Sequence, residues 1–177
     1  RRVLEGARVD GADYPFVQRF GDVALVGVSS AVATPVFDAT GMVGASQRAR
    51  VEKVLESLGA EGLTRIVLIH HPVLPGEAKK GHELRDLSEF GEVLARTGAE
   101  LVLHGHEHRM IEGRLPGPTT EAGPGSIPVF GVSSGTASAD NERRRARFAI
   151  FSVREGTIER RVHAWNGGAF EACATDA

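Results

Sequence analysis

Apolar residues form continuous runs in the first part of this sequence and shorter, alternating runs after residue 126. The continuous runs are residues 22–30 (DVALVGVSS), 66–69 (IVLI) and 100–104 (ELVLH). Runs of this kind are typical of strands that are covered on both faces in a parallel sheet. Residues 1–22 are mixed and weakly patterned, and residues 31–45, rich in Gly, Ala and Thr, predict a loop.

Two amphipathic helices are predicted between these runs. The first runs from Ser46, a residue type suited to an N-cap, to Leu58, and Gly59 is placed to end it. The second starts at Asp86 in a pattern like a capping box and is closed by Gly98. Their apolar faces are Val51, Val54, Leu55 and Leu58, and Leu87, Phe90, Val93 and Leu94. Strand, helix and strand in this order predict a right-handed βαβ crossover.

The rest of the sequence has a different character. Residues 113–126 are rich in Gly, Pro and Thr and predict a loop. Residues 126–134, 146–153 and 157–165 predict short strands, the last two joined by a hairpin-like turn. The fold class predicted from the pattern is therefore α/β (α+β), a βαβ unit followed by antiparallel strands.

Composition narrows the class of protein without identifying a function. The 177 residues are 41% apolar and 25% charged, as in a soluble globular domain, and a net charge of -2 gives no general attraction to nucleic acid. The arginine-rich segment 143–147 (RRRAR) has no interleaved aromatic residues and predicts a solvated turn. No run approaches the ~18 apolar residues of a membrane span. The single cysteine, Cys173, fits a reducing compartment, so we expect a cytoplasmic protein, with export left open because the sequence begins without methionine.

Six of the seven histidines lie between positions 70 and 108. They are His70, His71, His82, His104, His106 and His108. The pair in HHP directly follows one predicted parallel strand, and GHEH follows the next. Ligands of open α/β sheets bind beyond the carboxyl ends of the strands, and neutral imidazole is a common ligand for Zn, Mn, Fe and Ni. A single histidine at a strand end is more often structural, but two such groups one βα unit apart predict a metal site.

The segments IVLIHHP and LVLHGHEH resemble metal-binding blocks of the calcineurin-like metallophosphoesterases, and most closely the bacterial branch that includes cyclic-nucleotide phosphodiesterases and glycerophosphodiesterases. The resemblance implies a four-layer αββα sandwich and hydrolysis of a phosphomonoester or phosphodiester at two divalent metal ions, drawn from Mn, Fe, Zn, Co and Ni. It implies that His70 and His106 bind the second metal and that His108 binds the first. His71 and His104 do not match ligand positions and are expected to be supporting residues. His82 is expected in a surface loop, and His163 is expected to be structural.

The family's earlier blocks, Asp-x-His, Gly-Asp-x-x-Asp and Gly-Asn-His-Asp/Glu, do not occur in residues 1–177. The resemblance therefore implies that these residues are the C-terminal part of a single metallophosphoesterase domain. Its catalytic general-acid histidine and the remaining metal ligands would lie in an N-terminal part. We expect the 177-residue chain alone to be inactive or nearly so and to hold at most one metal ion, weakly. A sheet edge left open in this way also predicts a homodimer or strand exchange.

Two other interpretations stay open at this point. One is a mononuclear histidine-rich hydrolase that acts on non-phosphate esters. The other is a non-catalytic binding module that keeps the fold without its chemistry. The partner expected on the main interpretation is a small phosphate-ester substrate, with no nucleic acid and no membrane. The substrate and the metal are not identified by the sequence.

Overall fold

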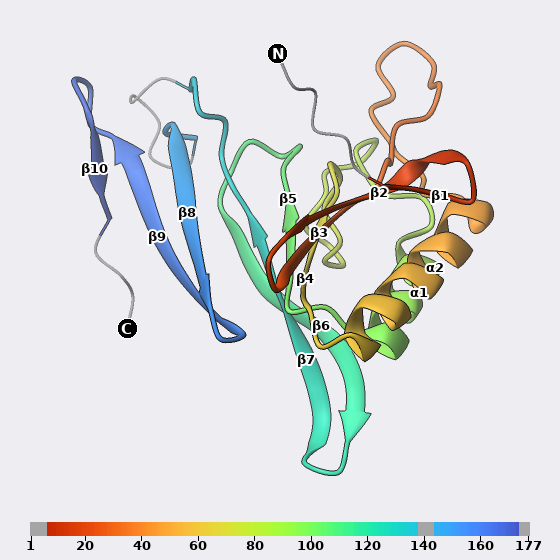
Figure 1. Cartoon of the computed structure of the whole chain (residues 1–177). Coiled ribbons are helices and arrows are strands. Elements are labelled where there is room, and N and C mark those ends of the chain that lie inside the picture. Colours follow the sequence, from red (N-terminus) through yellow and green to blue (C-terminus); the bar gives the residue numbers. More distant parts are fainter. Residues whose placement is uncertain (1–6, 138–143, 174–177) are drawn as a thin grey trace.

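The computed structural model describes residues 7–137 and 144–173, which form one helical layer and two sheets (Figure 1). The first half holds β1 (Ala7–Val9), β2 (Ala12–Phe20), β3 (Val23–Gly27), α1 (Ala45–Ala60), β4 (Thr64–Leu68) and α2 (Leu87–Thr97). The second half holds β5 (Leu101–His104), β6 (Ile111–Thr120), β7 (Gly123–Gly131), β8 (Arg147–Arg154), β9 (Thr157–Trp165) and β10 (Phe170–Ala172). The mixed α/β class is confirmed. Within the described ranges, no helix combines the length and the apolar character that a membrane crossing needs.

The larger sheet has seven strands in the order β1-β2-β3-β4-β5-β7-β6. Strands β3, β4, β5 and β7 are parallel to one another, whereas β1, β2 and β6 are antiparallel to their neighbours. The three continuous apolar runs are thus adjacent parallel strands, as predicted. Their carboxyl ends meet at one edge of the sheet, and the loops that contain the histidines follow from that edge.

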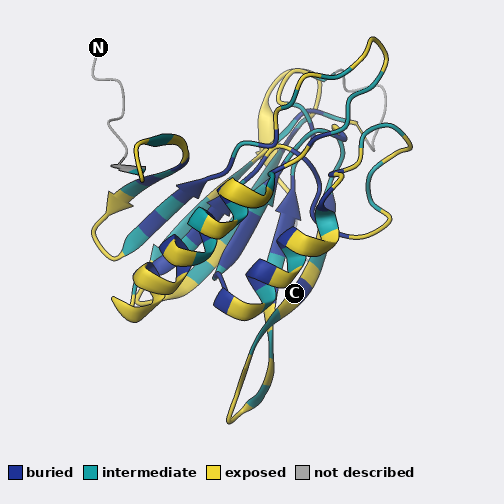
Figure 2. Cartoon of the chain, turned by 90° about the vertical axis from the view of Figure 1, so that its right-hand side faces the viewer, coloured by how far each residue is buried: buried dark blue, intermediate teal, exposed yellow. Residues whose placement is uncertain are grey.

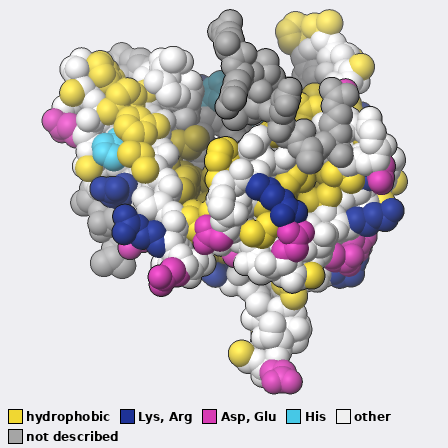
Figure 3. Space-filling model, viewed as in Figure 1, with side chains coloured by type: hydrophobic (Ala, Val, Ile, Leu, Met, Phe, Trp, Pro, Cys, Tyr) yellow, Lys and Arg dark blue, Asp and Glu magenta, His cyan; other side chains and the backbone are white. Residues whose placement is uncertain are grey.

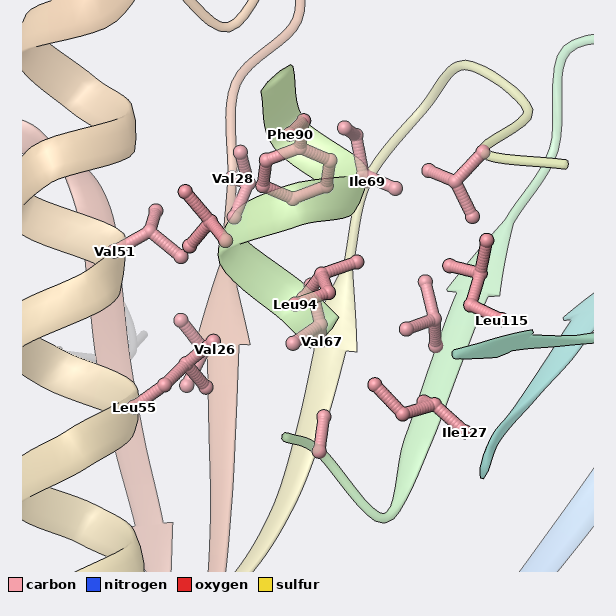
Figure 4. Packing of buried hydrophobic residues seen from close by; sticks show 14 of the residues in the cluster. Val26, Val28, Val51, Leu55, Val67, Ile69, Phe90, Leu94, Leu115 and Ile127 are labelled. Atoms are coloured by element: carbon pink, nitrogen blue, oxygen red, sulfur yellow. The ribbon is translucent and has the colours of Figure 1, made fainter. Parts of the chain in front are cut away.

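Both helices pack on one face of this sheet and bury one side of its strands (Figure 2). Val26 and Val67 of the sheet lie beneath Leu55 of α1 and Leu94 of α2, and all four are fully buried or nearly so (Figure 4). Phe90 is the largest fully buried side chain of this core. Burying an apolar side chain of this size stabilises a fold by about 1.5–3 kcal/mol, so this face supplies much of the driving force for folding.

The opposite face of the larger sheet is covered in part by the second sheet, whose strand order is β10-β9-β8. Phe130 of β7 meets Phe151 of β8 edge to face, with 5.6 Å between ring centroids. The guanidinium of Arg160 lies 4.3 Å from the centre of the Phe130 ring and pairs with Glu112 at 2.9 Å. Phe148 of β8 is an exposed apolar side chain of the three-stranded sheet. On the left of Figure 3, over this sheet, apolar side chains gather around a histidine.

Two segments differ from what the sequence suggested. Residues 1–22 were weakly patterned, yet residues 7–9 and 12–20 form β1 and β2 at the edge of the larger sheet. Residues 113–126 were predicted to be a loop, but most of them belong to the hairpin of β6 and β7. Most residues of the arginine-rich segment lie at the entry to β8, and Arg143 lies outside the described residues.

The predicted start of the first helix was also wrong. The helix begins at Ala45 after Gly44, so Ser46 is not its N-cap, and it continues past Gly59 to Ala60. The carboxylate that meets its amino end comes from Asp86, which accepts hydrogen bonds from the backbone N–H groups of Val43 (2.9 Å) and Gly44 (2.8 Å). Asp86 also pairs with Arg48. Asp86 is the N-cap residue of α2 by position, but its side chain makes no capping hydrogen bond there, because its oxygens serve α1.

Candidate metal centre

His70 and His106 come from the ends of the two adjacent parallel strands and lie in contact. His70 Nε2 and His106 Nδ1 are 2.9 Å apart, which is hydrogen-bond distance, and the ring centroids are 4.8 Å apart. His106 has a left-handed backbone conformation (φ 71°), which a non-glycine residue rarely adopts. The turn after β5 thus directs the His106 ring toward the end of β4.

His71 is buried beside this pair and is fully hydrogen-bonded. Its Nδ1 lies 2.7 Å from Ser30 Oγ and its Nε2 lies 3.0 Å from the carbonyl oxygen of Ala39. Because a carbonyl only accepts, Nε2 donates to Ala39 and Nδ1 accepts from the Ser30 hydroxyl. Burial lowers the pKa of His71 below its ordinary value. A Cβ on Gly41 would lie 2.4 Å from this ring, so only glycine leaves room for it. His71 is therefore held as a neutral supporting residue, and both of its nitrogens are engaged.

His104 is buried at the end of β5. Its Nδ1 lies 3.2 Å from the carbonyl oxygen of Gly105, and its Nε2 has no hydrogen-bond partner in the part of the chain that the structure describes. Burial lowers the pKa of His104, so the ring is neutral. A Cβ on Gly131, in the neighbouring strand, would lie 2.4 Å from the His104 ring. The absence of a side chain at Gly131, the last residue of β7, therefore leaves room for the His104 imidazole.

His82 and Glu107 join the cluster, although the sequence did not single them out as site residues. His82 was expected in a surface loop, and its backbone does lie in a loop, but its side chain points into the cluster. Its ring is half-buried and lies 4.8 Å from the His106 ring. The side chain of Glu107 is fully buried, with Lys79 Nζ 3.2 Å from one oxygen and His82 Nδ1 3.3 Å from the other. Ligand atoms of His82, His106 and Glu107 all lie within 4.8 Å of one another.

Charge in this cluster favours a cation. Burial acts to raise the pKa of Glu107, but the hydrogen bonds and the charge of Lys79 outweigh it, so the pKa is lowered and the carboxylate is ionised. Burial, followed by the neighbouring imidazoles of His71, His70 and His82, lowers the pKa of His106 to about 4. Neutral imidazoles and an ionised carboxylate are the forms that bind metal ions.

His108, the third predicted ligand, lies apart from these contacts. It is exposed, has a left-handed backbone (φ 51°), and makes no hydrogen bond, ion pair or ring contact with the described residues. His163, which was expected to be structural, stacks on Phe148 in the three-stranded sheet, with 4.8 Å between centroids and 6° between planes. The structure therefore brings together His70 and His106 of the predicted ligand set, and adds His82 and Glu107.

An open apolar groove of about 340 Å³ borders the cluster. Tyr14, Phe16, Leu68 and Leu103 line it together with His70 and His104. A larger cavity of about 440 Å³ lies between the two sheets, but no histidine lines it. The groove is the better candidate for a ligand site, because His70 of the cluster lines it together with apolar side chains.

Comparison with known proteins found no matching family model and no curated protein of significant similarity. A function for this chain therefore has to be inferred from the residues of the cluster and from the two histidine motifs.

Proposed function

We propose that this chain is the C-terminal part of a calcineurin-like metallophosphoesterase domain, which hydrolyses a phosphomonoester or phosphodiester with two divalent metal ions. The observation that carries the proposal is the 2.9 Å contact between His70 and His106, which follow the ends of adjacent parallel strands. Packing alone gives little reason for two polar rings to meet at a strand edge with two more imidazoles, of His71 and His82, against them.

The layers of the fold support the same proposal. One helical layer and two sheets are three of the four layers that an αββα sandwich requires. The outer face of the three-stranded sheet bears exposed apolar side chains, including Phe148, Ile150 and Phe170. A fourth, helical layer would bury this patch. Such a layer would come from an N-terminal part that also supplies the missing aspartates.

In the complete domain His70 and His106 would hold one metal ion, and His108 would contribute to the other. Two bound metal ions clamp a phosphate, lower the pKa of a water molecule and stabilise negative charge in the transition state. The exposed position of His108 fits a residue whose co-ligands come from another segment. His71, fixed by Ser30 and Ala39, would hold the orientation of the neighbouring rings.

A second candidate function is favoured by His82 and Glu107. Two imidazoles and one carboxylate are the ligand set of mononuclear zinc hydrolases, which keep a fourth position for water or substrate. On this alternative, the 177-residue chain alone would hydrolyse a non-phosphate ester.

Hydrolysis assays separate the two candidates. The complete domain, supplied with Mn²⁺, is expected to cleave bis(p-nitrophenyl) phosphate, and the 177-residue chain is expected to be inactive. His106→Ala should reduce the rate by more than the roughly 10–100-fold that follows loss of a residue supporting a metal ligand. His163→Ala, in a stacked histidine away from the cluster, should leave the rate unchanged. Turnover of p-nitrophenyl acetate by the isolated chain, together with no cleavage of the phosphate by the complete domain, would refute the proposal and support the alternative.

A further inference from the structure

We infer that His82, His106 and Glu107 form a binding site for one transition-metal ion, with Zn²⁺ the best fit, in this chain alone. Their ligand atoms lie within 4.8 Å of one another and come from two loops at the same edge of the sheet. The inference does not rest on the phosphoesterase proposal, because His82 and Glu107 match no ligand position of the motif. His106 is the only residue shared by the two ligand sets.

Each of the three residues has a buried nitrogen or oxygen atom that makes no hydrogen bond with the described residues. His82 Nδ1, His106 Nε2 and Glu107 Oε2 are buried and have no hydrogen-bond partner among the described residues. His82 Nδ1 approaches Glu107 at 3.3 Å, which is ion-pair distance without hydrogen-bond alignment. Buried polar atoms without hydrogen bonds carry a desolvation penalty, and a cation bound by this cluster would relieve it.

The orientation of His106 also fits a metal ligand. Its Nδ1 is engaged by His70 at 2.9 Å, which leaves Nε2 for a metal. Imidazoles that bind metals almost always have the other ring nitrogen held by a neighbouring group. His71 is excluded as a ligand, because both of its nitrogens are already hydrogen-bonded.

The donor set selects the metal. Ca²⁺ and Mg²⁺ take oxygen ligands, whereas two imidazole nitrogens and one carboxylate suit Zn²⁺. Ligand atoms of a tetrahedral zinc site lie about 3.3 Å apart, given metal–ligand distances of about 2.0–2.1 Å. The cluster must therefore contract from its present spacing. His82 can move because it lies in the loop 75–86, outside any helix or strand.

A metal ion would compete with Lys79 for the Glu107 carboxylate. Its ammonium lies 3.2 Å from Glu107 Oε2, and its side chain is 53% exposed, so it can turn into solvent. Binding of a dication would thus exchange one charge partner of the buried carboxylate for another. Removal of Lys79 should strengthen metal binding, which a purely structural role of Glu107 would not predict.

Calorimetric titration of the 177-residue chain with ZnCl₂, and the visible spectrum with Co²⁺, test the inference. We expect one equivalent of metal, a loss of affinity of about tenfold or more in His82→Ala and in Glu107→Gln, and a gain in Lys79→Met. His108→Ala and His163→Ala are the matched controls and should bind as the parent does. His82 is half-exposed, so its variant should fold even if Glu107→Gln does not.

Results that would overturn the metal-site inference can be distinguished from results that would overturn the phosphoesterase proposal. Loss of binding in His108→Ala, with His82→Ala and Glu107→Gln unaffected, would overturn the inference and leave the phosphoesterase proposal intact. Absence of binding by the parent chain, or binding that none of these variants weakens, would also overturn it. The hydrolysis assays on the complete domain report on the phosphoesterase proposal separately.

Discussion

Replacement of Asp86 by alanine should destabilise the fold far more than the loss of one carboxylate at the surface. The Asp86 side chain is 8% exposed and joins the start of α2 to the amino end of α1. The change would leave two backbone N–H groups, of Val43 and Gly44, without an acceptor and would leave the Arg48 guanidinium, 18% exposed, without its partner. It would also remove a negative charge from the positive end of the α1 dipole.

The expected loss follows from these contacts. An unsatisfied buried donor costs about 1–3 kcal/mol, and breaking a buried ion pair by removing one partner costs about 3–5 kcal/mol. The two costs overlap, because the same carboxylate serves all three donors. We therefore expect Asp86→Ala to lower the free energy of unfolding by about 3–5 kcal/mol, a large part of the 5–15 kcal/mol typical of a domain.

Urea unfolding followed by circular dichroism measures this loss. Glu52→Ala is the matched control, because Glu52 also joins the helices, through Arg96 at 2.8 Å, but at the surface. Exposed pairs contribute about 0.2–1 kcal/mol. The double variant Asp86→Ala/Arg48→Met should recover part of the loss, since it removes the unpaired cation. If Asp86→Ala and Glu52→Ala differ by less than about 1 kcal/mol, the assignment of the cost to buried unpaired donors is wrong.

Two further predictions concern the buried histidines. Gly131→Ala should displace the His104 ring, which lies 2.4 Å from the position of the new Cβ, and should lower the free energy of unfolding by about 1–3 kcal/mol. A urea midpoint equal to that of the parent chain would contradict the close approach of the ring to residue 131. Burial lowers the pKa values of His71, His104 and His106 in the folded state. Below about pH 6.5 the unfolded chain therefore binds more protons than the folded chain, so the free energy of unfolding should fall as the pH drops. The fall should continue toward pH 4, the approximate pKa of folded His106, and urea titrations in which stability rises over this range would refute the reasoning.

The parallel strands were predictable because their sequences carry their own burial pattern. Val67 and Val102 face the helices, while Ile66 and Leu101 face the second sheet, so both faces of each strand are apolar. A run without alternation is therefore informative by itself. The strand order that brings His70 beside His106 follows from the same βαβ pattern.

The edge strands were missed because prolines and glycines interrupt their patterns. β6 contains Pro116, Gly117 and Pro118, which a central strand would not tolerate. At the edge of the sheet one side of the strand needs no hydrogen bonds, and its register with β7 shifts at this point. Only the pairing with β7 makes these residues a strand, and that pairing is a tertiary contact that local sequence does not carry.

The difference between local sequence pattern and tertiary contact also decides which site residues could be predicted from the sequence. Histidines at strand ends were predictable, because topology fixes where a strand ends. His82 approaches His106 only through the path of a long loop, and nothing in the spacing of residues 70–108 predicts that path. Glu107 had a visible signal, since it lies inside GHEH, but a carboxylate between two histidines is ordinarily assumed to face solvent.

The loops 31–44 and 75–86 share backbone hydrogen bonds, from Ala39 N–H to the Gly81 carbonyl (2.9 Å), from Gly41 N–H to Glu83 (3.0 Å) and from Arg85 N–H back to Gly41 (2.8 Å). A surface loop usually opens on its own at low free-energy cost. Here neither loop can open without breaking bonds to the other, so they should fluctuate as one cooperative unit. Any ligand that His82 holds would slow amide exchange in both loops. Its effect would extend to Gly41, against the His71 ring, in a segment that contributes no predicted ligand.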